Sequence, residues 1–249
     1  VSAPMTSTKA QLETTFGADD YDFISVDTQH SPFNEERLVE FCGIAAEVGI
    51  PVHLRIKHTR HSYLIGNLLD LGPALIEVPQ TETLETAQEA VDYFYFPQFG
   101  KRSWGGAARY GVQGREDRLE YAEWWNNTGV LWLQIESLHA ITRAAQIALP
   151  GVDCLSWGPA DLSFNREANP EHPLQTDDDC VEYALKVLKG TDTKLLIRSY
   201  DPNLRNTVCP QCGSDLRDPH PCDLTHDNNL PQVTPQGELT QSAGKQGDD

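Results

Sequence analysis

The sequence predicts an α/β protein, a (β/α)8 TIM barrel that is incomplete at both ends. Short apolar runs alternate with amphipathic segments over the first 200 residues, which is typical of strands joined by helices around a parallel sheet. A length of 249 residues suits one such barrel. The main alternative is an open doubly wound sheet, and it is disfavoured because no G-x-G-x-x-G follows the first strand.

The predicted elements follow one another in regular alternation. Seven strand-like runs occupy residues 1–3, 22–27, 51–56, 74–78, 131–136, 152–157 and 194–199. Helical spacing is found in residues 7–16, 34–49, 61–71, 81–95, 115–126, 137–149 and 176–188. We expect the first strand to be partial and the last βα unit to be missing. A long loop, residues 97–114, is rich in glycine, arginine and aromatic residues, and a loop of that length is functional or disordered.

The pattern ends near residue 200. We expect residues 1–200 to form the barrel domain and residues 201–249 to be a polar, disordered tail, because the tail has few aliphatic side chains. The alternative is a small zinc site in the tail, since a structural zinc ion needs four cysteine or histidine ligands. Its candidate ligands are Cys209, Cys212, His220, Cys222 and His226.

Charge and hydropathy exclude several function classes. The net charge of −18 argues against binding to nucleic acid or to an anionic membrane surface. No apolar run is long enough to span a membrane, and the first residues lack the pattern of a signal peptide. We therefore expect a cytoplasmic protein.

Two carboxylates mark the central strand–helix–strand unit, residues 131–164. Glu136 stands at the end of one strand, and Asp161 stands just past the end of the next. Parallel strands end at the same edge of a sheet, so the two carboxylates come together there. Their repulsion needs a compensating charge, and a hard divalent cation with oxygen ligands supplies it. The sequence therefore predicts a metal site held by Glu136 and Asp161.

Other polar residues stand at the same edge, where active sites of barrels lie. Asp27 and His30 follow the second strand, Arg55 belongs to the third, and Gln134 lies near the end of the fifth. Asp70 ends the helix after the third strand and can reach back to orient His30. The three histidines around the third strand are interpreted as surface residues rather than a second metal site: His53, His58 and His61.

Five short motifs, in this order, resemble the HpcH/HpaI class II (metal-dependent) 2-keto acid aldolases. They are V-D-T-Q-H-S-P at 26–32, Arg55 after P-V at 51–52, L-L-D-L-G at 68–72 followed by V-P at 78–79, Q-I-E at 134–136, and G-P-A-D-L-S at 158–163. Gln29 stands where the family usually has glutamate, and Gln80 stands where it has methionine. The resemblance covers residues 1 to about 205.

The resemblance implies a role for each candidate residue. Glu136 and Asp161 would ligate Mg²⁺, Mn²⁺ or Co²⁺, and Arg55 would hold the ketone oxygen of a pyruvate-like substrate. His30, oriented by Asp70 or Asp27, would be the acid/base group. The residues expected to bind the substrate are Arg55, Gln134, Gly158, Pro159, Ala160 and Asp161.

The implied reaction is reversible aldol cleavage of a 4-hydroxy-2-keto acid to pyruvate, or a related 2-keto acid, and an aldehyde. Arg102 and Arg109 in the long loop are expected to meet an acidic aldehyde or a neighbouring subunit, and a complete barrel is expected to form a homo-oligomer. One alternative is a citrate lyase β-like enzyme acting on a CoA thioester, against which His30 argues. Another is a catalytically inactive fragment whose tail binds zinc.

Overall fold

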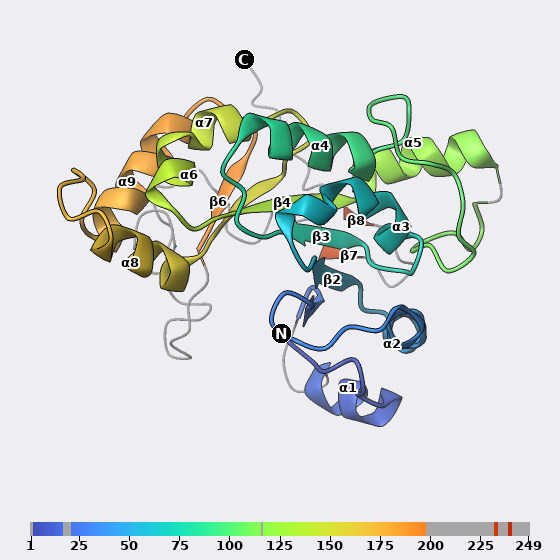
Figure 1. Ribbon diagram of the computed structural model, residues 1–249. Helices are drawn as coiled ribbons and strands as arrows, with labels where there is room; N and C mark the ends of the chain where they lie inside the picture. Colours follow the sequence, from blue (N-terminus) through green and yellow to red (C-terminus); the bar gives the residue numbers. More distant parts are fainter. Residues whose placement is uncertain (1, 17–20, 116, 198–231, 234–238, 241–249) are drawn as a thin grey trace, which may run out of the picture.

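The computed structural model describes residues 2–16, 21–115, 117–197, 232–233 and 239–240. Its main sheet contains six parallel strands, each paired with the next in the order of the sequence (Figure 1). They are β1 (Ile24–Asp27), β2 (Val52–Arg55), β3 (Leu75–Val78), β4 (Val130–Ile135), β5 (Cys154–Trp157) and β6 (Lys194–Leu196). This order without reversal is that of a barrel, whereas the strand order of a doubly wound sheet reverses at a switch point. The predicted barrel-type α/β fold is confirmed.

Within the described residues both ends of this sheet are incomplete, as the sequence predicts. The partial first strand is present as a single parallel bridge between Ser2 and Ser25, next to β1. Within the described residues, β5 is the one strand that pairs with β6, so no eighth strand closes the sheet there. The division of the chain at residue 200 stays a prediction.

Helices connect the strands on the outer side of the curved sheet (Figure 1). They are α1 (Lys9–Phe16), α2 (Glu35–Val48), the 3₁₀ helix η1 (Thr59–Leu64), α3 (Ile65–Leu69), α4 (Leu84–Phe94), α5 (Arg118–Thr128), α6 (Leu138–Thr142), α7 (Ala144–Ile147), α8 (Pro159–Glu167) and α9 (Asp177–Leu188). Helix α4 contacts α7, and both α6 and α7 pack against α9.

Two predicted helices differ from the structure in their interior. The single helix expected at residues 137–149 is divided into α6 and α7, because Arg143 leaves helical geometry with φ −108° and ψ 9°. The helix expected at 61–71 begins as the 3₁₀ helix η1, which starts at Thr59 with the His58 side chain as its cap. Apolar spacing alone does not distinguish a continuous helix from two short ones with a common buried face.

Alternation along the strands divides their side chains between two environments. Leu54 of β2, Ile76 of β3 and Leu133 of β4 belong to the large core between the sheet and the helices. A smaller apolar cluster lies on the opposite, inner face of the sheet, and it includes Leu75, Trp132 and Cys154. Because the polar residues of the same strands share this inner face, they are positioned on a rigid and mostly buried frame.

The long loop at 97–114 is folded onto the barrel by arginine–aromatic stacking. The Arg102 guanidinium lies 4.7 Å from the ring centroids of both Phe96 and Trp125, and Arg109 lies 4.1 Å from that of Trp104. Only 1% of Arg102 and 8% of Arg109 is exposed. The expectation that these two arginines meet an aldehyde or another subunit is therefore wrong for this conformation, because both are used inside the fold.

Two short strands, β7 (Gln232–Val233) and β8 (Leu239–Thr240), pair antiparallel in the C-terminal segment. The candidate zinc ligands at 209–226 lie outside the described residues. In the part of the chain that is described, every helix is too short or too polar to cross a lipid bilayer.

Candidate active site

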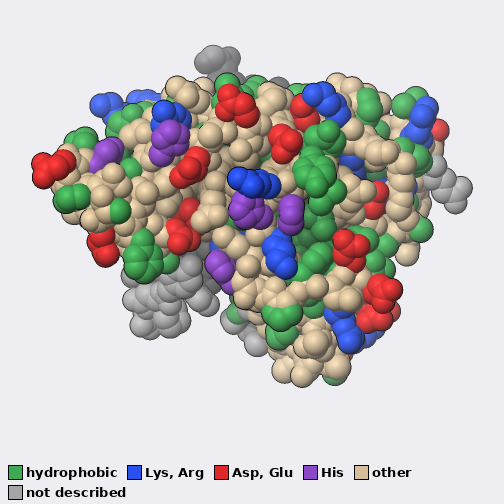
Figure 2. Space-filling model, in the orientation of Figure 1, with side chains coloured by type: hydrophobic (Ala, Val, Ile, Leu, Met, Phe, Trp, Pro, Cys, Tyr) green, Lys and Arg blue, Asp and Glu red, His purple; other side chains and the backbone are tan. Residues whose placement is uncertain are grey.

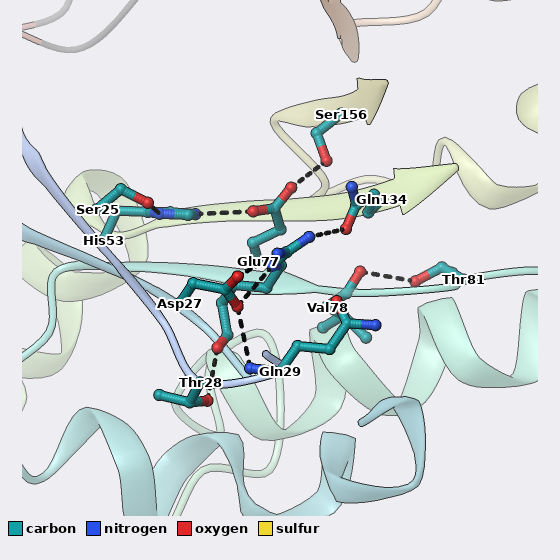
Figure 3. Close-up of polar contacts among 11 residues, drawn as sticks. Ser25, Asp27, Thr28, Gln29, His53, Glu77, Val78, Thr81, Gln134 and Ser156 are labelled. Carbon is teal, nitrogen blue, oxygen red and sulfur yellow. Dashed lines mark hydrogen bonds and ion pairs between the residues drawn. The ribbon is translucent and has the colours of Figure 1, made fainter. Parts of the chain in front are cut away.

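A buried polar chain crosses the inner face of the sheet from β1 to β5 (Figure 3). The Ser25 Oγ lies 2.9 Å from His53 Nδ1, and His53 Nε2 lies 3.4 Å from Glu77 Oε2. The other carboxylate oxygen of Glu77 accepts a hydrogen bond from the Ser156 hydroxyl. His53 is 1% exposed and Glu77 is fully buried, so the interpretation of His53 as a surface residue is wrong.

Arg55 lies one alternation further along β2 than His53, at the carboxyl edge of the sheet. Its Nε donates to Asp27 Oδ1 at 2.9 Å, its Nη2 donates to Asp27 Oδ2, and its Nη1 donates to Gln134 Oε1 at 3.1 Å (Figure 3). The register explains the first contact, because Asp27 of β1 is paired with Arg55 of β2. The structure thus brings together three of the predicted site residues.

These contacts use three of the five N–H groups of the guanidinium and leave one on Nη1 and one on Nη2. Burial disfavours the charge of Arg55, but the hydrogen bonds and charge of Asp27, helped by Glu77 and Glu136, raise its pKa above the ordinary value. For Asp27, burial is likewise outweighed by Arg55, and its pKa is lowered. Arg55 is therefore a fixed cation that can donate to a negatively charged oxygen.

Glu136 follows β4 and is only 5% exposed. Its Oε1 accepts a hydrogen bond of 2.9 Å from the Gln80 backbone N–H, in the turn after β3. Burial, and after it the charge of the Asp161 carboxylate, raises the pKa of Glu136 to about 7. The two carboxylates thus influence each other electrostatically, and their convergence on one metal ion stays a prediction.

Gly158 leaves room for the side chain of Glu136. A Cβ atom at position 158 would lie 2.5 Å from both Cβ and Oε2 of Glu136, closer than real Cβ contacts occur. The residue also caps α8, and its N–H donates to the Ile135 carbonyl at 3.1 Å. Of the predicted carboxylate-binding residues, Gly158 already donates its N–H to Ile135, and Pro159 has no N–H. Ala160 and Asp161 therefore supply the backbone donors that remain at the start of α8.

His30 is exposed and lies beside Asp27, whose pKa its charge helps to lower. Of the two carboxylates expected to orient His30, Asp27 is thus the nearby one. Asp70 has a different partner: its Oδ1 accepts from Arg102 Nη2 at 2.9 Å. The expectation that Asp70 reaches back to His30 finds no support in these contacts, because the buried Arg102 holds its carboxylate.

A cavity of about 840 Å³ lies between the N-terminal residues 2–6 and the beginning of α2. Asp27 forms part of its wall, but Arg55, Glu136 and Asp161 do not. We assign the chemistry to the Arg55–Glu136 edge and not to this cavity, because the paired carboxylates and the fixed guanidinium lie at that edge.

Reasoning from the sequence missed Glu77, Ser156 and the backbone of Gln80. A glutamate inside the apolar run L-I-E-V was a usable signal, since a fully buried acidic side chain needs partners. Gln80 has φ +45°, a left-handed conformation that is uncommon outside glycine. No side-chain pattern predicts that contact.

Residues 5–180 match the sequence model of HpcH/HpaI aldolase/citrate lyase. Hydroxypyruvate/pyruvate aldolase of Sagittula stellata is 33% identical over 170 residues, which are 66% of this chain and 64% of that protein. The 2-keto-3-deoxy-L-rhamnonate aldolase of Klebsiella pneumoniae is 31% identical over 162 residues, 64% of this chain and 59% of that one. The chain thus spans slightly less than two thirds of the length of these relatives.

Solved structures show the same fold. An HpcH/HpaI aldolase from Desulfitobacterium hafniense superposes with a TM-score of 0.67 at 22% identity, covering 82% of this chain and 78% of that one. A family protein from Burkholderia cenocepacia gives 0.66 at 24% identity, with 84% and 82% covered. The strand order, the matched residues 5–180 and the five motifs agree, and the chain belongs to the HpcH/HpaI aldolase/citrate lyase family.

Proposed function

We propose that this protein is an aldehyde-lyase that reversibly cleaves a 4-hydroxy-2-keto acid to pyruvate, or a related 2-keto acid, and an aldehyde, in a reaction dependent on a divalent metal ion. The observation that carries the proposal is the position of a fixed guanidinium with two remaining N–H groups at the edge where two carboxylates meet. The names of the related aldolases support the same class of reaction.

The residues at this edge fit a hard divalent cation. Glu136 and Asp161 offer carboxylate oxygens, the ligands that Mg²⁺ and Mn²⁺ prefer, and their mutual repulsion is relieved by a shared positive charge. Among the described residues no group of three or more His, Cys, Asp and Glu is arranged around a metal. Two protein ligands leave positions for substrate and water, as in a catalytic rather than a structural site. When bound, Mg²⁺, Mn²⁺ or Co²⁺ supplies Lewis acidity toward the ketone and carboxylate oxygens of the substrate.

The chain's own residues account for the remaining chemistry. In the cleavage direction, His30 takes the proton of the C4 hydroxyl, and the C3–C4 bond breaks as the aldehyde forms. The electron pair of that bond forms the C2–C3 double bond, and negative charge moves to the ketone oxygen. The two remaining N–H groups of Arg55 donate to this oxygen, where the charge develops. His30 then returns the proton to C3 and yields the 2-keto acid.

Each supporting residue has a defined task in this scheme. Asp27 and Gln134 fix the plane of the Arg55 guanidinium, and the backbone N–H groups of Ala160 and Asp161 receive the substrate carboxylate. Gln80 holds Glu136 in place through its N–H. Assembly as a homo-oligomer and the acid/base role of His30 stay predictions from the family resemblance.

Pyruvate release from 4-hydroxy-2-oxopentanoate tests the proposal, followed with lactate dehydrogenase and NADH. We expect activity in the presence of Mn²⁺ or Mg²⁺, loss of activity with EDTA, and recovery when excess metal is added. E136Q and D161N should lose activity, whereas K186Q, a change of an exposed lysine on α9, should not. Activity that resists EDTA, or that survives both carboxylate substitutions, would exclude the proposed reaction.

A further inference from the structure

An isolated basic segment stands out in this acidic protein. The chain has 37 acidic and 19 basic residues, yet residues 48–69 contain no Asp or Glu. The basic and histidine residues of this segment lie in β2, in the turn that follows it and at the beginning of η1: His53, Arg55, Lys57, His58, Arg60 and His61. Two of these side chains, His53 and Arg55, are used inside the barrel, and the other four form what we name the 57–61 patch.

The 57–61 patch is exposed and its charges are not compensated. Lys57, His58 and Arg60 are exposed and His61 is partly so. In the described part of the chain, neither Lys57 nor Arg60 forms an ion pair with an acidic side chain. Arg102 and Arg109 are not available in the same way, because they are buried and aromatic rings cover them.

The two histidines add donors to the same patch. The His58 Nδ1 accepts a hydrogen bond of 3.0 Å from the Arg60 backbone N–H, so the proton of the neutral ring is on Nε2. The His58 and His61 ring centroids are 6.4 Å apart. Figure 2 shows blue and purple side chains gathered near the middle of this face, over the segment that contains η1, with red side chains around them on several sides.

The patch lies at the edge of the sheet where the proposed chemistry takes place. Lys57 comes two residues after Arg55, so their Cα atoms are at most about 7.6 Å apart. The carboxyl edge is therefore divided by charge, with Glu136 and Asp161 after β4 and β5 and the 57–61 patch after β2. The patch thus begins two residues along the chain from Arg55, the residue proposed to hold the ketone oxygen of the substrate.

We propose that the 57–61 patch binds an anionic group on the aldehyde half of the substrate, a carboxylate or a phosphate, with Lys57 and Arg60 as the main contacts. This inference rests on the proposed lyase function and names its substrate class. A positive patch beside the site also steers an anion that the net charge of −18 would otherwise repel. The same net charge disfavours a nucleic acid or an anionic lipid surface as the occupant.

The kinetic test compares acceptors that differ in charge and little else, in the direction of carbon–carbon bond formation from pyruvate. The pairs are 4-oxobutanoate with butanal, and glyceraldehyde 3-phosphate with glyceraldehyde. We expect the ratio of kcat/KM for the charged over the neutral acceptor to fall about tenfold in K57Q/R60Q, which is roughly the loss of one strong charge contact. The double variant K186Q/K189Q removes the same charge from exposed positions, one in α9 and one directly after it, and should leave the ratio unchanged.

A second readout needs no turnover, so that failure of this inference and failure of the lyase function can be told apart. The His58 and His61 Cε1–H resonances, assigned with H58Q and H61Q, are followed by NMR during titration with inorganic phosphate and with 4-oxobutanoate. Saturable shifts in the wild type that disappear in K57Q/R60Q are expected even if no aldol product forms. Comparison of the titration with 4-oxobutanoate and the titration with phosphate shows which anion the patch prefers.

Three results would overturn the inference. One is an unchanged charged-to-neutral ratio in K57Q/R60Q, and another is the absence of saturable shifts with both anions. The third is retention of the protein on heparin at about 0.15 M salt, where only strong polyanion binding survives screening. That outcome would assign the patch to a macromolecular polyanion instead.

Discussion

Asp27 and Arg55 are register partners on adjacent parallel strands, and both oxygens of the Asp27 carboxylate accept hydrogen bonds from the Arg55 guanidinium. This fork-to-fork contact fixes the plane of the guanidinium, which a single hydrogen bond would leave free to rotate. Gln134 of β4 adds a third contact, because its Oε1 accepts a hydrogen bond of 3.1 Å from Arg55 Nη1. Arg55 is thus preorganised before any substrate binds.

D27N is expected to reduce kcat/KM for pyruvate release about 100-fold, because misplacement of a charge-stabilising group by about 1 Å costs rates of that order. The Asn side chain presents an N–H₂ group to the guanidinium and cannot accept from both Nε and Nη2. The measurement is steady-state kinetics with E40Q as the control, since Glu40 is an exposed residue of α2. Activity of D27N within threefold of the wild type would show that the contact does not position Arg55.

G158A should weaken divalent metal binding and also lower the free energy of unfolding, because the Cβ of Glu136 that it meets is fixed to the backbone. The added Cβ would meet Cβ and Oε2 of Glu136 at 2.5 Å, so the carboxylate has to leave its present position. We expect the Mn²⁺ affinity to fall at least about tenfold, as for changes that disturb the orientation of metal ligands. G43A is the matched control, because a Cβ at position 43 meets nothing within 4 Å. Equal Mn²⁺ affinity in G158A and G43A would contradict this account of Gly158.

Asp153 is predicted to make the fold pH-sensitive. Burial raises its pKa to about 6 from the ordinary 3.8, although the Leu131 N–H donates to its Oδ2 at 2.8 Å. Because the folded-state pKa is raised, the stabilising contribution is complete below the unfolded value of 3.8 and is lost as the pH rises through about 6.

D153N keeps an oxygen acceptor for Leu131 and removes the buried charge. It should therefore be more stable than the wild type above about pH 6, by at most about 3 kcal/mol, and equally stable below about pH 4. Thermal melts across this pH range measure the difference, with D192N at an exposed position as the control. A D153N curve parallel to the wild-type curve at all pH values would contradict the prediction.

D70A should destabilise the protein, because it leaves the Arg102 charge buried without its carboxylate partner. A loss of about 3 kcal/mol is expected for breaking a buried pair in this way. D92A breaks the pair of Asp92 with the exposed Lys101, which solvent screens, and should therefore cost much less stability than D70A. Urea unfolding of both variants measures the contrast. If D70A were as stable as the wild type, the account of Asp70 as the charge partner required by the buried Arg102 would be wrong.

The sequence was sufficient to predict the strands and the edge at which the polar residues meet. Parallel strands have one carboxyl edge, so Asp27, Arg55, Gln134 and Glu136 could be placed there from their positions at strand ends. Which of these side chains pair could not be predicted, because pairing depends on register. Asp27 was expected to orient His30, and the register gives its two oxygens to Arg55.

The burial and pairing of polar side chains was the second feature that could not be predicted from the sequence. His53 alternates with Arg55 on one side of β2, so its inward direction followed from strand periodicity, but its partner Glu77 lies in a run that is otherwise apolar. The contact between Asp70 and Arg102 depends on how a long loop folds back over α3, and local sequence patterns do not determine such long-range contacts.

Binding of Mn²⁺ to the wild type, E136Q and D161N, followed by electron paramagnetic resonance, tests the central claim most directly. We predict one tight Mn²⁺ site per chain, at least about 100-fold weaker in either variant, as expected for loss of one of two protein ligands. Its affinity should fall below about pH 7, where protons compete for Glu136. Wild-type affinity in both variants, or no Mn²⁺ binding by the wild type near neutral pH, would contradict the claim that these two carboxylates hold one ion beside Arg55.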